Sequence, residues 1–227
     1  MPPREELTKT AVSGAERRLE DVARALPRAP RELAVRVGQA AEALADLARE
    51  TGVDLMAVGA HGRREGLWAD LGSTAEKLLA SSPVPVLVCH GFEDEPPRRL
   101  LVPIDDSADA RHALAWAAFL AERLGAGLVL LHVVSSALLG AMRRVSSVAA
   151  ASQLDERLRT GVERWLGELA ADTGLPPERI TYMVETGVPE LQILASAARL
   201  ECDLVVLGSR GSGGGHVLGL GSVARAV

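Results

Sequence analysis

The chain has 227 residues, of which 48% are apolar and 24% charged. This composition is ordinary for a folded globular protein and excludes global disorder, a collagen and a disulfide scaffold. Its net charge of −5 and its 3% of aromatic residues argue against nucleic acid as the main partner, though not against a single nucleotide. No apolar run approaches the about 20 residues of a membrane helix, and the first residues carry no apolar signal core. We therefore expect a cytoplasmic protein without a membrane partner. We also expect Cys89 and Cys202, both in apolar stretches, to be reduced core residues.

In the first part of the chain, hydrophobic periodicity and glycine or proline punctuation predict alternating helices and strands. Helices are predicted over residues 5–26, 40–49 and 74–79, and strands over residues 33–37, 55–58 and 84–89. Residues 92–99 contain Pro96, Pro97 and mixed charges, so they are predicted to be a linker.

The second part of the chain continues the alternation. Strands are predicted over residues 100–104, 128–134, 180–184 and 204–207, and helices over residues 108–124, 154–173 and 189–200. Ser107 is a good N-cap for the first of these helices and Gly125 fits its end, while Ser222 is expected to cap one more helix. Strands that are apolar on both faces and separated by helices predict a parallel sheet covered on both sides. Right-handed crossovers make it a doubly wound, open α/β sandwich, with a ligand crevice beyond the carboxyl ends of its strands.

An internal repeat relates the two parts, because landmarks recur at a constant difference of 149 in residue number. The pairs are Asp54 and Asp203, Gly59 and Gly208, Gly62 and Gly211, and Gly72–Ser73 and Gly221–Ser222. A unit of this length is a duplicated domain rather than a solenoid repeat of about 20–50 residues.

The offset also predicts that both units are incomplete. Unit 1 (residues 1–91) lacks counterparts of the first two strands, and unit 2 (residues 100–227) lacks a counterpart of the last. We interpret the chain as a fragment of a longer gene or a shortened reading frame. The alternative is a chain that evolved in this form and completes its sheets by dimerising.

The glycine-rich loop after the last predicted strand carries the functional signal. It reads Gly208, two residues, Gly211, nine residues and Gly221–Ser222, and it leads into a helix start. Glycines let the backbone approach a ligand closely, and free N–H groups at a helix start favour an anion such as phosphate. The loop is not a P-loop, because no lysine follows its last glycine. It is not the dinucleotide fingerprint, which belongs at the first strand–helix turn.

A flexible connection without a ligand is the alternative interpretation of such a loop. The same glycine spacing recurs in unit 1, at Gly59, Gly62 and Gly72–Ser73. Because a flexible linker has no reason to keep this spacing in two copies, the repeat favours a ligand site.

Together these motifs resemble the universal stress protein family in its tandem two-domain form. The stretches that carry the resemblance are Leu101-Val-Pro-Ile-Asp105-Asp-Ser107, Leu130-Leu-His-Val133, Gly187-x-Pro189, Asp203-Leu-Val-Val-Leu-Gly208 and the glycine loop. The resemblance implies an α/β sandwich like that of the adenine nucleotide alpha hydrolases. Its glycine loop implies the ATP-binding branch, so the expected ligand is ATP, with or without Mg²⁺.

The resemblance also implies roles for individual positions of unit 2. Asp105 matches the acidic residue near the nucleoside, and Pro103 and Val133 match residues that line the adenine pocket. The positions that match the phosphate loop are Gly208, Arg210, Gly211, Gly221, Ser222 and Val223. Arg210 stands where many members have histidine, and a guanidinium binds phosphate well. From the residues alone, the alternative for Asp105 is a plain turn residue beside Ser107.

A second site in unit 1, at Gly59, Gly62, Gly72 and Ser73, is doubtful. Unit 1 has no counterpart of Asp105 or Val133, and its loop carries Glu65 and Asp70, which disfavour a polyphosphate. The five histidines have no metal-ligand spacing, and His132 is interpreted as a buried strand residue, so no metal site is expected.

The favoured function is a nucleotide-binding stress-response or signalling module. The alternatives are a ligand-free dimerisation or assembly module and, with less support, an ATP-consuming enzyme on the same fold. The loop contains no lysine or carboxylate, and no nucleophile–base pair can be placed, so no catalytic residue is assigned. Slow ATP hydrolysis is compatible with this interpretation. Besides the adenine nucleotide, the expected partner is a second copy of the chain or the other unit of the same chain.

Overall fold

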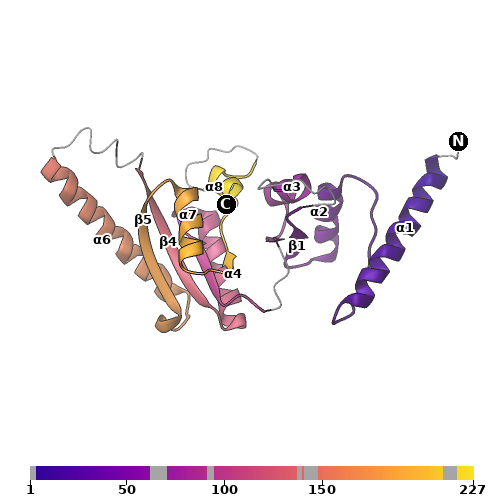
Figure 1. Cartoon of the computed structure of the whole chain (residues 1–227), viewed down its shortest axis with the longest axis horizontal. Coiled ribbons are helices and arrows are strands. Elements are labelled where there is room, and N and C mark those ends of the chain that lie inside the picture. Colours follow the sequence, from indigo (N-terminus) through magenta and orange to yellow (C-terminus); the bar gives the residue numbers. More distant parts are fainter. Residues whose placement is uncertain (1–3, 62–70, 91–94, 137–139, 141–147, 212–218) are drawn as a thin grey trace. The chain divides into compact units, whose positions relative to one another are not determined.

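A computed structural model describes residues 4–61, 71–90, 95–136, 140, 148–211 and 219–227. The chain divides into two compact units, Met1–His90 and Gly91–Val227, and each is considered by itself (Figure 1). Among the helices in these ranges, none has both the length and the apolar character needed to cross a membrane.

Unit 2 is built on a parallel sheet in the order β5-β4-β3-β6. The strands are β3 (Arg99–Pro103), β4 (Gly127–Ser135), β5 (Ile180–Gly187) and β6 (Leu204–Val205). The chain adds β4 and β5 on one side of β3 and then returns to place β6 on the other side. This reversal confirms the predicted doubly wound α/β sheet, with β6 two residues shorter than expected at its end.

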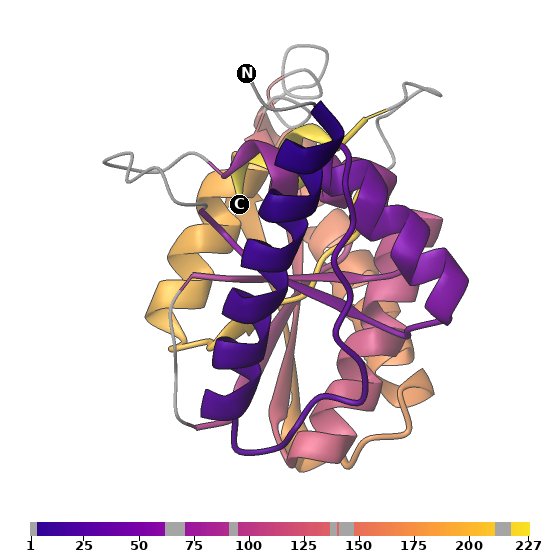
Figure 2. The same ribbon diagram turned by 90° about the vertical axis from the view of Figure 1, so that its right-hand side faces the viewer.

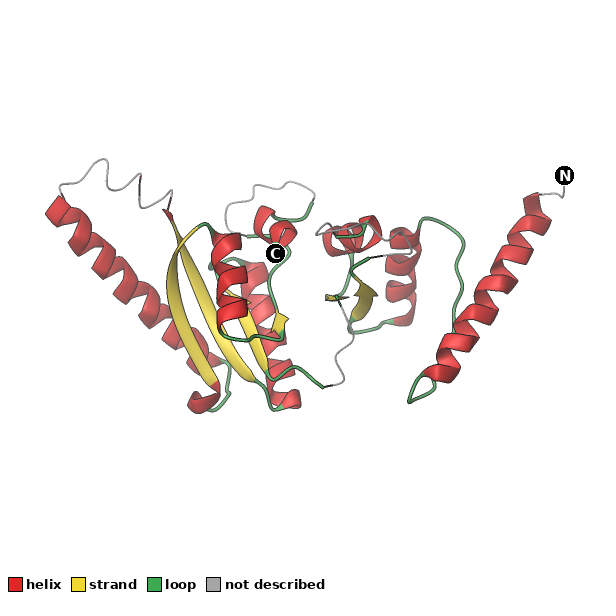
Figure 3. Ribbon diagram, in the orientation of Figure 1, coloured by secondary structure: helices red, strands yellow, loops and turns green. Residues whose placement is uncertain are grey.

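Helices cover both faces of this sheet (Figure 3). The helices are α4 (Ala108–Leu124), α6 (Val148–Asp172), α7 (Pro189–Arg199), the short α8 (Ser222–Ala226), and a 3-10 turn at Pro177–Arg179. Their positions follow the sequence pattern, except that α6 begins at Val148 rather than at residue 154. The helices α4 and α6 pack on one face, and α7 with α8 on the other.

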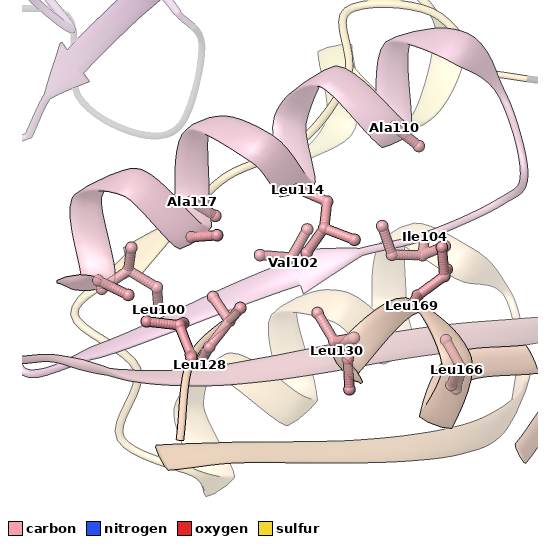
Figure 4. Packing of buried hydrophobic residues seen from close by; sticks show 14 of the residues in the cluster. Leu100, Val102, Ile104, Ala110, Leu114, Ala117, Leu128, Leu130, Leu166 and Leu169 are labelled. Atoms are coloured by element: carbon pink, nitrogen blue, oxygen red, sulfur yellow. The ribbon is translucent and has the colours of Figure 1, made fainter. Parts of the chain in front are cut away.

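The core of unit 2 follows the two-residue period of a strand. Leu100, Val102 and Ile104 of the β3 segment point toward α4 and α6 (Figure 4). Leu101 belongs to the cluster on the opposite face. Leu100, Leu101 and Val102 are fully buried, as expected for a parallel sheet covered on both sides. Each such side chain contributes about 1.5–3 kcal/mol by leaving water, so this sheet is the stable base on which the site is built.

The ends of α4 are fixed by side chains and glycine. The Ser107 hydroxyl accepts the Ala110 N–H at 3.1 Å, and Gly125 takes the left-handed conformation with φ of 70°, which confirms both predicted caps. The Arg179 guanidinium also donates to the carbonyls of Ala121 and Ala126 at the carboxyl end of this helix. Hydrogen bonds therefore fix both ends of α4, and its first turn lies at the carboxyl edge of the sheet.

The prediction that Ser222 caps the last helix is wrong. Gly221 occupies the N-cap position with extended φ and ψ of −61° and 154°, and no side chain caps α8. Ser222 is already the first helical residue. The equivalent helix of unit 1 begins in the same way, with Gly72 at the cap and Ser73 in the first turn.

Unit 1 contains two parallel strands in its described part, β1 (Met56–Gly59) and β2 (Val86–Cys89), paired along their length. Its helices are α1 (Arg4–Ala25), α2 (Ala40–Thr51) and α3 (Ser73–Ser81). All five elements were predicted to within two residues. The core is small and centres on Ala41, Ala45 and Leu78.

The strand predicted over residues 33–37 does not form. The chain between α1 and α2 runs as a loop (Figures 2 and 3), with Leu33 42% and Val37 72% exposed. Its counterpart at the 149-residue offset is β5, which pairs along its whole length with β4. A strand needs a neighbour to satisfy its backbone groups. The offset gives this segment no counterpart of β4 in the sequence, so its apolar residues have no sheet to join.

The cysteine prediction is wrong for one of the two thiols. Both are free, but Cys89 is exposed at the carboxyl end of β2, while Cys202 is half-buried. Burial raises the pKa of the Cys202 thiol above its usual value, which is consistent with an unreactive packing residue.

Candidate functional site

Asp105 stands in the turn that connects β3 with α4, at the carboxyl edge of the unit 2 sheet. One of its carboxylate oxygens accepts the Ser107 N–H at 3.2 Å, and Asp106 follows in the left-handed region with φ of 63°. The other oxygen, Oδ2, faces the glycine loop, where a β-carbon on Gly211 would lie 2.7 Å from it. Asp105 is therefore a turn residue and a neighbour of the loop at once.

Gly208, the first glycine of the loop, packs against the first turn of α4. A β-carbon at this position would lie 2.8 Å from the Asp109 backbone carbon and 2.9 Å from the Ala110 nitrogen. Both atoms belong to a rigid helix, so any side chain would separate the loop from α4. The close approach of two backbones explains this glycine without a ligand.

Gly221, the last glycine, closes the loop. Its N–H donates to the Ser209 carbonyl at 2.8 Å, and a β-carbon would lie 3.2 Å from the same oxygen. In unit 1 the Gly72 N–H donates to the Ala60 carbonyl, also at 2.8 Å. The last glycine of the repeated spacing is therefore explained by loop closure in both units. The sequence did not reveal this structural reason. Gly211 differs, because its nearest neighbour is the end of a side chain rather than backbone.

Three side chains tie the start of the loop to α4, and we call Asp109, Ser209 and Arg210 the clasp. Oδ2 of Asp109 accepts the Ser209 hydroxyl at 3.0 Å and Nε of Arg210 at 3.1 Å. The Ser107 hydroxyl lies 3.4 Å from the Arg210 carbonyl. Burial raises the pKa of Asp109, but the hydrogen bonds from Arg210 and Ser209 outweigh that effect, so its pKa lies below the usual range.

Sequence reasoning missed Asp109 and Ser209. An acidic residue in the first turn of a helix is common, because it complements the helix dipole, and it gave no signal of its own. A serine between two glycine-loop positions is equally ordinary. Only the packing of Gly208 on α4 brings them together.

The remaining predicted residues lie along the same edge of the sheet. Pro103 ends β3 opposite Leu131, and Val133 lies two residues further along β4. Val133 and Val223 are both half-buried and pack into the hydrophobic cluster on the α7 side. The structure thus gathers Asp105, Gly208, Arg210, Gly211 and Gly221 at one place, with Pro103, Val133, Ser222 and Val223 at its border.

His132 is half-buried within β4, where Nδ1 lies 2.7 Å from the Ile104 carbonyl oxygen and the ring meets Trp165 edge-on. It serves as a packed strand residue, as the sequence suggested. In the described ranges, no three histidine, cysteine or acidic side chains converge in a way that could hold a metal ion.

In unit 1, Gly59, Gly72 and Ser73 keep the positions of their counterparts at the end of β1 and the start of α3. Gly62, Glu65 and Asp70 lie outside the described residues. Ala60 and His61 stand where unit 2 has Ser209 and Arg210, and no residue of the sequence corresponds to Asp105 or Asp109.

A model described as the universal stress protein family matches residues 2–90 and again residues 97–227. The chain belongs to the universal stress protein family. Universal stress proteins Rv2623 (strain ATCC 25618 / H37Rv) and MT2698 (strain CDC 1551 / Oshkosh) of Mycobacterium tuberculosis are each 30% identical to it over 179 residues. The match covers 76% of this chain, which spans 57% of the length of these curated relatives.

Two solved structures share the fold. A universal stress protein from Archaeoglobus fulgidus aligns with a TM-score of 0.72 and 23% identity, covering 100% of this chain and 78% of that one. The protein PA1789 from Pseudomonas aeruginosa aligns with a TM-score of 0.66 and 18% identity, covering 95% of this chain and 73% of that one. At this level of identity the likeness shows the fold alone.

Proposed function

We propose that unit 2 binds an adenine nucleotide, with ATP as its ligand, at the edge formed by Asp105 and the glycine loop. The observation that carries the proposal is the approach of the Asp105 carboxylate to Gly211, at a place that a β-carbon would fill. It lies beyond the carboxyl ends of the strands, beside β3, where the strand order reverses. Ligands of doubly wound sheets bind at this position.

The residues at this edge fit the parts of a nucleotide. The Asp105 carboxylate is an acceptor for ribose hydroxyls, and the half-buried Pro103 and Val133 offer an apolar surface to a base. Arg210 suits the phosphates because a guanidinium binds them well, and Gly211 lets the backbone approach a ligand closely. Mg²⁺ would enter with the phosphates.

The charges around the edge are compatible with an anionic ligand, although three aspartates lie close to it. Asp106 is paired with Arg111, and Asp109 is bonded to Arg210 and Ser209. These two carboxylates are therefore compensated by neighbouring donors. The residues from Gly208 to Ser222 include no carboxylate.

We propose that the protein works by binding rather than by turnover, as a stress-response or signalling module. The loop offers neither a lysine nor a carboxylate to assist phosphoryl transfer. We expect phosphate release well below the about 1–100 per second of ordinary kinases. A coupled phosphate assay on the purified chain measures this directly, and release within that range would place the protein among enzymes.

Isothermal titration of the whole chain with ATP and Mg²⁺ tests the binding. We expect a dissociation constant in the micromolar range, about −8 kcal/mol. Gly211→Val should abolish the signal, because a branched side chain would collide with the Asp105 carboxylate and fill the space. Gly62→Val, the equivalent change in unit 1, is the matched control and should leave binding unchanged.

Asp105→Asn is a second variant, which keeps the shape of the side chain while removing its charge. It should weaken ATP binding without altering the thermal midpoint by more than a few degrees. No heat with millimolar ATP in the wild-type chain, or equal losses from Gly211→Val and Gly62→Val, would contradict the proposal.

A further inference from the structure

Arg210 is held by one part of its guanidinium. Nε bonds to Asp109 at 3.1 Å, and the side chain remains 68% exposed. Among the described residues, Asp109 is the side-chain partner of Arg210. The two terminal Nη nitrogens take no part in this bond, and such nitrogens can donate charge-assisted bonds to phosphate oxygens.

The carboxylate that holds Arg210 is itself fixed. Asp109 lies in the first turn of the capped helix α4, its backbone is in contact with Gly208, and its side chain is 24% exposed. The Ser209 hydroxyl donates to the same oxygen that binds Nε. A helix-borne acceptor with two donors has little freedom, so it restricts the orientation of the arginine.

We infer that Asp109 is a positioning residue of the nucleotide site, which holds Arg210 by Nε and leaves its Nη groups ready for the phosphates. The inference rests on the proposed function. It adds the means by which the site would bind ATP, which carries phosphates, more tightly than adenosine, which does not. A long side chain that is oriented in advance loses less conformational entropy when the ligand binds.

The residues of the clasp have different counterparts in the sequence of unit 1. At the 149-residue offset, unit 1 has Ala60 and His61 in place of Ser209 and Arg210, and the sequence contains no counterpart of Asp109. The two glycine loops are therefore alike in spacing and different in the means of orienting a cation. This difference gives a physical reason to expect phosphate binding in unit 2.

A double-mutant cycle in the whole chain tests the inference, with ATP and adenosine titrated against each variant. We expect Asp109→Asn to weaken ATP binding about 10-fold and to leave adenosine binding within about 2-fold, because adenosine lacks the phosphates. Arg210→Gln should cost at least as much. In the Arg210→Gln background, Asp109→Asn should have no further effect, since its role passes through Arg210.

Asp106→Asn is the matched control, because it removes a neighbouring carboxylate from another ion pair, with Arg111. Asparagine tolerates the left-handed backbone of this position, and the ratio of ATP to adenosine affinity should stay unchanged. Asp109→Ser provides the same comparison should Asp109→Asn fail to fold.

The outcomes test the proposed function and the positioning role of Asp109 separately. A wild-type chain that binds neither ATP nor adenosine refutes the proposed function and the positioning role with it. A wild-type chain that binds ATP while Asp109→Asn leaves ATP affinity unchanged refutes the positioning role alone. The role is equally refuted if Asp109→Asn weakens ATP and adenosine in parallel, which marks a structural residue, or if it tightens ATP, which marks competition for Arg210.

Discussion

The two units of this universal stress protein share the way their glycine loops close but differ in their strands. Loop closure is the same in both: Gly72 donates to Ala60 and Gly221 to Ser209, each at 2.8 Å. Gly38 and Gly187, equivalent at the 149-residue offset, share a φ of 156°. These features depend on a few neighbouring residues, so each copy forms them independently.

Strand structure behaves differently. The eight residues of β5 pair with β4, whereas the equivalent residues 31–38 of unit 1 form no strand. Leu204 packs against the core of unit 2, but its counterpart Leu55 is 40% exposed. Turns and helices here depend on residues close in sequence, whereas a strand forms only where another strand pairs with it.

Amide hydrogen exchange should give the largest contrast. Amides of β5 that donate to β4 should exchange about 1,000-fold more slowly than those of residues 31–38, because they open only with much of the unit. Mass spectrometry of peptic peptides from the whole chain measures both segments in one experiment. Comparable protection would mean that residues 31–38 acquire a partner in solution.

Truncating the two equivalent leucines should give the next largest difference between the units, measured as the free energy of unfolding. We expect Leu204→Ala to destabilise unit 2 by about 2 kcal/mol and Leu55→Ala to destabilise unit 1 by less than about 1 kcal/mol, since the cost follows the packing lost. Urea unfolding followed by circular dichroism provides the values. Equal costs would show that Leu55 is covered as well as Leu204 is.

Replacing the glycine that closes the loop should lower stability by a similar amount in the two units. A β-carbon would lie 2.9 Å from the Ala60 carbonyl oxygen at Gly72 and 3.2 Å from the Ser209 oxygen at Gly221. Gly72→Ala and Gly221→Ala should each cost about 1–2 kcal/mol by forcing the loop apart. Thermal melts of both variants test this, and a change that lowers ATP affinity without lowering stability would instead assign Gly221 to the ligand.

The smallest effect concerns Asp203, whose carboxylate accepts the N–H groups of Arg98 and Arg99 at 2.7 and 2.8 Å. Burial raises the pKa of Asp203, but these bonds outweigh it and hold the pKa below the usual range. A pKa lower in the folded than in the unfolded state stabilises above about pH 3.9, and the benefit is lost as the pH falls through the native pKa.

Asp203→Asn should therefore lower stability at pH 7 by less than about 1 kcal/mol, because solvent screens this exposed carboxylate, with the difference shrinking toward pH 3. Asp54→Asn is the control, because unit 1 has no counterpart of β3 in the sequence. Thermal midpoints across this pH range test the prediction, and a pH-independent difference would contradict it.

The sequence by itself determined the features that rest on local chemistry. The bounds of α4, the Ser107 cap and the Gly125 end follow from residues within one turn of each other. The 149-residue repeat and the alternation of strands and helices were also sufficient for the doubly wound fold, because apolar strands with helical crossovers have few ways to pack.

Only the tertiary structure decided what depends on neighbours distant in sequence. It left residues 33–37 without a strand, placed Cys89 in solvent, and gave Gly208 and Gly221 structural reasons for being glycine. It also joined Asp109 to Arg210, a hundred positions away in the chain. Close backbone approaches and side-chain bonds between such segments are set by the sheet that brings them together, and no local pattern encodes them.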